Sequence, residues 1–136
     1  MSTTFSKEEK AAMRAAAAEA KAVQAGADLQ AACREAITAM TGTDRELADK
    51  LHELVITHTG LSPKTWYGMP AYANAAGKVV VFFQSAAQFK VRYATIGFQP
   101  DAQLDEGDFW PTSYAVTKLS AADQERLLAL LAQAAG

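Results

Sequence analysis

The fold of this chain is decided by residues 64–98, KTWYGMPAYANAAGKVVVFFQSAAQFKVRYATIGF. Aromatic and β-branched residues crowd into this stretch, whereas the residues before it are rich in alanine. In segment 89–94, apolar side chains alternate with cations at a period of two, which is typical of a strand with one face on a core and one in solvent. The alternating residues are Phe89, Lys90, Val91, Arg92 and Tyr93. The stretch therefore predicts an antiparallel sheet.

Turn-forming residues predict the other strands of this sheet. A bend is expected at Gly68-Met69-Pro70, because the residue before a proline is pushed towards extended geometry. Asn74 and Gly77 suit the first and last positions of a type I turn, so a hairpin is expected there. Further strands are predicted at 79–84, 95–98 and 112–116.

Helices are predicted on both sides of the sheet region. Ser6 and Glu9 fit a capping box ahead of an alanine-rich run, so a first helix is expected over 6–24, with Gly26 interrupting it. A second helix is expected to carry an apolar stripe. The stripe consists of Leu29, Cys33, Ile37 and Met40.

Two more helices follow. A third is expected to open with a capping box from Thr43 to Glu46 and to end at Gly60 in a left-handed conformation. Its apolar face consists of Leu47, Leu51, Leu54 and Val55. The last helix begins at the cap Ser120. Its inward residues are Leu127, Leu130 and Leu131.

Together these elements predict an α+β fold in which an antiparallel sheet of about five strands packs against helices, with extra helices at the N-terminus. The chain has 136 residues, of which 50% are hydrophobic, and this suits a single domain with a substantial core. Residues 1–25 are expected to be an alanine-rich helical appendage, because they offer few large apolar side chains to bury. Residues 26–136 are expected to form the domain.

Composition excludes several classes of protein. A formal net charge of -2 argues against a nucleic-acid-binding face. The longest run of large apolar residues, 79–83, is too short to span a membrane, so no membrane association is expected. Cys33 is the only cysteine, and the N-terminus resembles no targeting segment, so a cytoplasmic location is expected.

One candidate site combines cations with aromatic rings. Cations on strand 89–94, together with a lysine and rings at the sheet margin, predict a pocket on the sheet face for a small anion or a protein partner. The candidate residues are Lys64, Trp66, Tyr67, Lys90, Arg92 and Tyr93. The alternative interpretation is a solvated sheet face without a ligand, with most of the aromatic rings in the core. Trp66 is expected to be one of the structural rings.

A second candidate is an acidic loop that could bind a metal weakly. Its residues are Asp101, Asp105, Glu106 and Asp108. Their spacing does not match a calcium-binding loop, and solvated carboxylates are the alternative. A second acidic group on the third helix consists of Asp44, Glu46 and Asp49.

Histidine and cysteine suggest no catalytic or metal site. His52 and His58 are six residues apart, which separates them by about 240° around a helix, so they do not form a metal pair. His52 is expected at the surface and His58 partly buried. Cys33 is expected to be a buried thiol. Because no nucleophile, base and orienting residue can be assembled, a non-enzymatic protein is favoured over an enzyme.

Four strings resemble the YdhG-like family of small bacterial domains. These are KTWYGMPAY at 64–72, VVVFFQ at 79–84, FKVRYATIGF at 89–98 and LDEGDFWPT at 104–112, and the resemblance covers about residues 43–134. It implies a frataxin-like sheet packed against helices and a role as a weak iron-binding protein or metallochaperone with an iron-acceptor partner. No tightly bound cofactor is expected, and the chain is expected to be a monomer or a weak homodimer. The alternative is a binding module that uses the sheet-face pocket.

Overall fold

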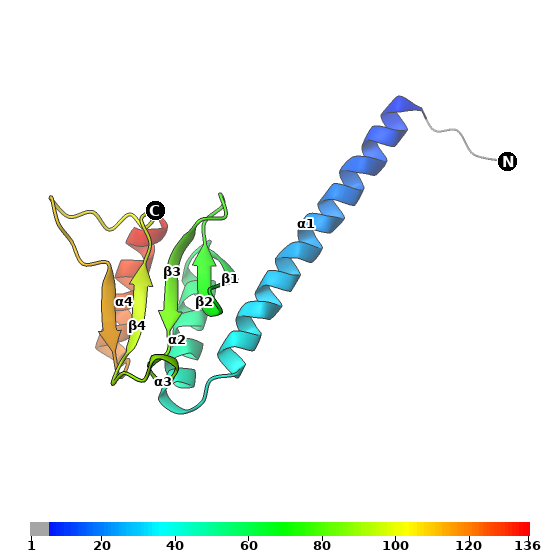
Figure 1. Ribbon diagram of the computed structural model, residues 1–136. Helices are drawn as coiled ribbons and strands as arrows, with labels where there is room; N and C mark the ends of the chain where they lie inside the picture. The colour runs from blue at the N-terminus through cyan, green and yellow to red at the C-terminus, as the bar shows by residue number, and fades with distance from the viewer. Residues whose placement is uncertain (1–5) are drawn as a thin grey trace.

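The computed structural model describes residues 6–136, without the side chains of residues 15, 19, 22 and 23, and it has an α+β fold (Figure 1). Five antiparallel strands form one sheet in the order β1-β2-β3-β4-β5, so each strand pairs with the next along the chain. The strands are β1 (Ser62–Trp66), β2 (Met69–Ala73), β3 (Val79–Gln84), β4 (Ala94–Phe98) and β5 (Ser113–Val116). The predicted fold class and strand number are confirmed.

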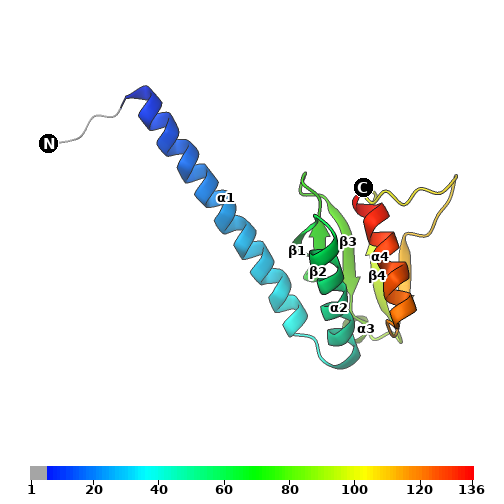
Figure 2. The ribbon, with the colours of Figure 1, turned by 180° about the vertical axis from the view of Figure 1, so that it is seen from behind.

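The helices lie on one face of the sheet. They are α1 (Lys7–Thr38), α2 (Gly42–His58), the single turn α3 (Ala86–Phe89) and α4 (Ala121–Ala135). α2 and α4 stand behind the sheet in Figure 1 and in front of it in Figure 2, and the C-terminal end of α1 packs beside them against β1 and β2. None of the helices that the structure describes is long and apolar enough to cross a bilayer.

The core lies between these helices and the covered face of the sheet. The predicted apolar face of α2 is confirmed, since all four of its residues are buried. The inward leucines of α4 are confirmed too, with Leu127 and Leu131 buried and Leu130 half-buried. Cross-strand pairing places Val81 beside Phe98, and Phe83 beside Ile96, on the covered face. Each such side chain stabilises the fold by roughly 1.5 to 3 kcal/mol through burial.

α1 is a single helix of 32 residues, so the predicted interruption at Gly26 is wrong. A glycine inside a helix costs only about 1 kcal/mol relative to alanine, which the flanking alanine-rich turns offset. The expected cap at Ser6 is confirmed, because its hydroxyl accepts from the Glu9 amide at 3.1 Å. Cys33 and Ile37 are buried, whereas the described side chains of residues 7–31 are exposed. Most of α1 therefore projects from the domain as an arm (Figure 1).

The strand predicted over 89–94 is wrong. The chain forms the helical turn α3 there, and Lys90 ends it in a left-handed conformation with φ 54°. The cause lies far away in the sequence, because the buried carboxylate of Asp44 accepts from the amides of Ala86 and Ala87 at 2.8 and 3.0 Å. These bonds satisfy amides that the first turn of a helix leaves without partners. The alternation of apolar and cationic residues carried no information about this contact.

The β2–β3 turn is confirmed and the β1–β2 turn is corrected. The Gly77 amide donates to the Asn74 carbonyl at 2.9 Å, as the type I turn requires. The β1–β2 hairpin instead turns at Tyr67 and Gly68, both with positive φ, and Met69 already belongs to β2. Two such residues are typical of the hairpin turn that matches the twist of a sheet.

The ends of α2 also differ from the prediction. No side chain caps its start, where Thr41 precedes the helix, so the capping box at Thr43 is wrong. The helix ends at His58 with extended Thr59, rather than with Gly60 in a left-handed conformation. The Thr59 hydroxyl donates to the Val55 carbonyl at 2.7 Å and accepts from the Leu61 amide at 3.2 Å, which ends the helix without a glycine.

The face of the sheet that the helices leave open carries an aromatic pair. The rings of Trp66 and Phe82 lie 5.1 Å apart, and Trp66 is only half-buried and lies outside the core. Trp66 thus packs on the open face of the sheet rather than at a join between sheet and helices, because its strand position directs it away from the helices. Phe82 lies over Gly97, its partner in the register, where a β-carbon would overlap the ring.

We expect Gly97→Ala to destabilise the fold by about 1 to 3 kcal/mol, because the Phe82 ring must leave its place beside Trp66. Urea unfolding followed by circular dichroism measures the loss. The matched control is Gly97→Ala in a Phe82→Leu background, where the smaller side chain should reduce the cost by at least half. An equal cost in both backgrounds would show that the ring is not the cause.

Candidate functional site

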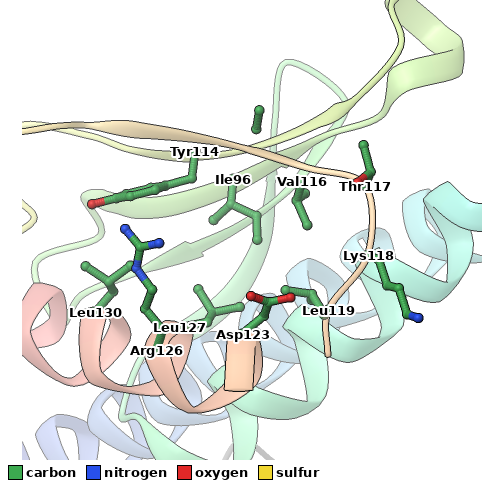
Figure 3. A pocket seen from close by; sticks show the side chains of 11 residues that line it. Ile96, Tyr114, Val116, Thr117, Lys118, Leu119, Asp123, Arg126, Leu127 and Leu130 are labelled. Carbon is green, nitrogen blue, oxygen red and sulfur yellow. The ribbon is translucent and has the colours of Figure 1, made fainter. Parts of the chain in front are cut away.

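A pocket of about 270 Å³ lies between β5 and α4. Its walls come from β4 and β5, from the segment that joins β5 to α4, and from the first turns of α4. Side chains from the strands and from α4 point towards one another across it (Figure 3). Its apolar lining consists of Ile96, Ala115, Val116, Leu119, Leu127 and Leu130. Its polar lining consists of Tyr114, Thr117, Lys118, Asp123 and Arg126.

Local sequence places these side chains. Tyr114 and Val116 are two residues apart on β5, so both point to the covered face of the sheet. On α4 the lining residues recur at steps of three and four, which gathers them on one side of the helix. Ser120 fixes where the helix starts, since its hydroxyl accepts from the Asp123 amide at 3.2 Å and its own amide donates to the Asp123 carboxylate at 3.0 Å. The predicted cap at Ser120 is confirmed.

The charges of the pocket do not cancel. The Arg126 guanidinium carbon lies 5.7 Å from the centre of the Tyr114 ring, within range of a cation–π interaction. Among the side chains that the structure describes, no carboxylate lies within 4.0 Å of Arg126 or Lys118. Hydrogen bonds from Ser120, assisted by the two cations, lower the pKa of Asp123, so this carboxylate is ionised at neutral pH. Two cations and one anion leave the pocket with one net positive charge.

Two of the six predicted ligand residues line a different hollow. Lys64 and Trp66 border a space of about 310 Å³ at the end of the sheet that carries the β2–β3 turn. Lys78 and Asp101 complete its charged lining, so a second cation faces the same hollow as Lys64. The sequence analysis did not include Lys78 among the candidates. Its position directly after the turn glycine, at the start of a hairpin strand, could have indicated it.

The other four predicted residues lie elsewhere. Tyr67 is at the β1–β2 turn and is 83% exposed, although its ring contacts Trp66 at 4.8 Å. The Arg92 guanidinium lies 5.3 Å from the centre of the Tyr93 ring and lines a hollow beside Asp44. Lys90 ends α3 and is exposed. The structure thus distributes the six residues over separate places, because 89–94 is not a strand.

The acidic residues do not converge. In the described part of the chain, no three His, Cys, Asp or Glu side chains form a group that could hold a metal ion. Asp101 accepts from the Asn74 side-chain amide at 3.3 Å, while Asp105, Glu106 and Asp108 are exposed on the loop between β4 and β5. In the second acidic group, Asp44 is engaged by α3 and Asp49 pairs with Arg45 at 2.8 Å.

A buried polar cluster joins α1, β2 and α2. The Tyr72 hydroxyl is 2.9 Å from His52 Nδ1 and 4.0 Å from the Cys33 sulfur. The sequence did not predict these two contacts, because the three residues are far apart along the chain. His52 is half-buried and His58 exposed, the reverse of the prediction, because His52 is on the side of α2 that meets Tyr72. Burial raises the pKa of the Cys33 thiol and of the Tyr72 hydroxyl. A thiol held neutral in this way is a packing group rather than a nucleophile.

We compared the chain with models of known families, with curated proteins and with solved structures, and found no match in any of the three. The likeness to the YdhG-like family therefore rests on the four sequence strings and stays a prediction.

His52 should make the fold less stable in mild acid. Burial, with repulsion from Arg34, lowers its pKa below the usual 6.5, so the unfolded chain takes up a proton first as the pH falls. Stability should therefore be independent of this group above pH ~6.5 and decrease below it, through the pKa of the folded state. Urea midpoints between pH 7.5 and 5 measure the effect.

His52→Gln should flatten this part of the pH profile, whereas His58→Gln, at an exposed position on the same helix, should keep the wild-type profile. Parallel profiles for the wild type and His52→Gln would contradict the assignment.

Iron should bind no more tightly than micromolar, because exposed carboxylates are the available ligands. Calorimetric titration with ferrous iron under anaerobic conditions measures the affinity. Neutralising Asp105, Glu106 and Asp108 together as amides should remove most of the heat. Nanomolar affinity, or metal that stays bound in equimolar amount through purification, would contradict this expectation.

Proposed function

We propose that this chain is a non-catalytic binding domain whose pocket between β5 and α4 holds an apolar group that carries a single carboxylate. One observation carries the proposal: Arg126 lies over Tyr114 beside an apolar cavity, with no carboxylate of the described residues within 4.0 Å. A cavity lined mainly by apolar side chains, with a few polar groups that fix orientation, is the usual form of a small-ligand site.

The lining supports both parts of such a ligand. Leu119 and Leu130, which are half-buried, offer apolar surface above the buried Ile96 and Leu127, and each methylene buried there contributes about 0.8 kcal/mol. The exposed Arg126 guanidinium can recognise a carboxylate through two parallel hydrogen bonds. Arg126 is thus suited to the charged end of the ligand and the leucines to its body.

Asp123 restricts the charge that the pocket accepts. Its carboxylate faces the same space as Arg126 and stays ionised, so it repels a second negative charge on the ligand. The pocket is therefore suited to a monoanion and disfavours a dianion such as a phosphate monoester.

Binding accounts for the lining better than catalysis. The pocket contains neither cysteine nor histidine, and its one carboxylate is already bound to Ser120. The sequence predicted a pocket that combines cations with aromatic rings, and the pocket between β5 and α4 has this combination. The residues that supply it are Tyr114, Lys118 and Arg126, which are not the predicted ones.

Titration with hexanoate, followed by the amide resonances of ¹⁵N-labelled protein, tests the proposal. Resonances of residues 114–119 and 123–130 should shift and saturate at millimolar concentrations, because so small a ligand gains little from burial. Arg126→Gln should weaken binding by about tenfold, which corresponds to a charged hydrogen bond of about 1.4 kcal/mol.

The matched control is Lys21→Gln, which removes an equal charge from the exposed arm of α1 and should bind like the wild type. Hexan-1-ol should bind more weakly than hexanoate to the wild type and equally to Arg126→Gln. Shifts confined to other regions, or equal hexanoate affinity in Arg126→Gln, would overturn the proposal.

A further inference from the structure

The outer edge of β5 has backbone groups without strand partners. β5 is the last strand of the sheet, and its register pairs Ile96 with Tyr114 and Ala94 with Val116. The Phe98 amide donates to the Thr112 carbonyl at 2.7 Å, one step further along the same register. Because backbone groups alternate in direction along a strand, Tyr114 and Val116 bond to β4, and the backbone groups of Ser113 and Ala115 face outward.

The edge of the sheet at β1 is protected from pairing with other chains, and the edge at β5 is not. β1 contains Pro63 and Lys64, and α1 packs against it. Proteins commonly use proline, charge and covering elements to keep strand edges from pairing with other chains. β5 has the sequence SYAV, with neither proline nor charge, and its register with β4 has no bulge. Of the two edges of this sheet, the one at β5 is thus suited to pairing.

The pocket lies directly beside this open edge. Tyr114 and Val116 line it from β5, and Lys118 and Arg126 give it net positive charge. In a strand added to β5, every second side chain would point to the same side of the sheet as Tyr114 and Val116, towards α4. Two such side chains are about 6.6 Å apart along the strand, so one can enter the apolar part of the pocket while the next meets Arg126.

We propose that β5 accepts an extended segment of a partner protein as a sixth strand, with one apolar and one acidic side chain, two residues apart, directed into the pocket. This rests on the proposed function, because the acidic side chain would be the monoanion and the apolar one the body of the ligand. The interaction is strand addition, in which main-chain bonds supply affinity and a pocket for alternate side chains supplies specificity.

Charge favours an acidic partner over a second copy of this chain. Antiparallel pairing of two β5 strands about Tyr114 and Ala115 would bring Arg126 of one copy towards Arg126 of the other on one side of the sheet, because this arginine lies over Tyr114. Like charges that meet across an interface oppose association. An acidic segment meets the same groups with opposite charge.

The probe is the peptide fluorescein-Gly-Gly-Thr-Leu-Thr-Glu-Thr-amide, and its binding is measured by fluorescence anisotropy. Replacing glutamate by glutamine in the peptide, or Arg126→Gln in the protein, should weaken binding by about tenfold. Lys21→Gln should leave it unchanged. Ala115→Pro, which removes one outward amide without removing a bond to β4, should abolish peptide binding and keep the circular dichroism spectrum of the wild type.

Two further peptides test the strand geometry without any change to the protein. One is N-methylated at the three threonines and the other at the leucine and the glutamate. A strand bonds to its neighbour through alternate residues only, so one of these peptides should lose at least tenfold in affinity and the other should not.

The outcomes separate this inference from the proposed function. Hexanoate binding together with no peptide binding, or with equal affinity for the two methylated peptides, would overturn strand addition and leave the pocket intact. Failure of both hexanoate and peptide would overturn both proposals. Sedimentation that shows dimers of the free protein, lost in Ala115→Pro, would assign the edge to a second copy and overturn the acidic partner.

Discussion

The buried hydroxyl of Tyr72 constrains the arrangement of the helices. The side chain is fully buried between sheet and helices, and an unsatisfied hydroxyl there would cost about 1 to 3 kcal/mol. His52 on α2 satisfies it, and Cys33 on α1 completes the contact. Both helices are thereby held against β2, near the β1 edge of the sheet. α4 lies next to α2 and covers the part of the sheet that carries β4, up to β5 (Figures 1 and 2).

The pocket and the open edge lie together at the β5 side of the sheet. Between β5 and the first turns of α4, a space remains that side chains of both elements line. Charged side chains at the first turns of α4 border that space because the Ser120 cap sets the rotation of the helix. Because β5 is the last strand in the order of the sheet, its outer backbone groups have no strand partner among the described residues. A pocket and an open strand edge thus lie side by side.

Sequence patterns predicted the features that depend on neighbouring residues. The apolar faces of α2 and α4, the Ser120 cap and the turn from Asn74 to Gly77 are local, and all are confirmed. The segment 89–94 failed because Asp44, more than 40 residues earlier, bonds to the backbone of α3. The pocket was missed for a related reason. Tyr114 lies on a strand and Arg126 on a helix, and only tertiary packing brings the ring and the guanidinium together.

The arm of α1 has a hydrodynamic consequence. A helix rises about 1.5 Å per residue, so residues 7–28 extend about 33 Å, more than twice the radius of gyration of about 13 Å expected for a domain of 100 residues. An extension of this kind increases friction far more than it increases mass. In a sizing column the 14.5 kDa chain would elute ahead of a compact protein of equal mass, as a small dimer would. Its molar mass in solution is therefore measured by light scattering or sedimentation equilibrium rather than by elution volume.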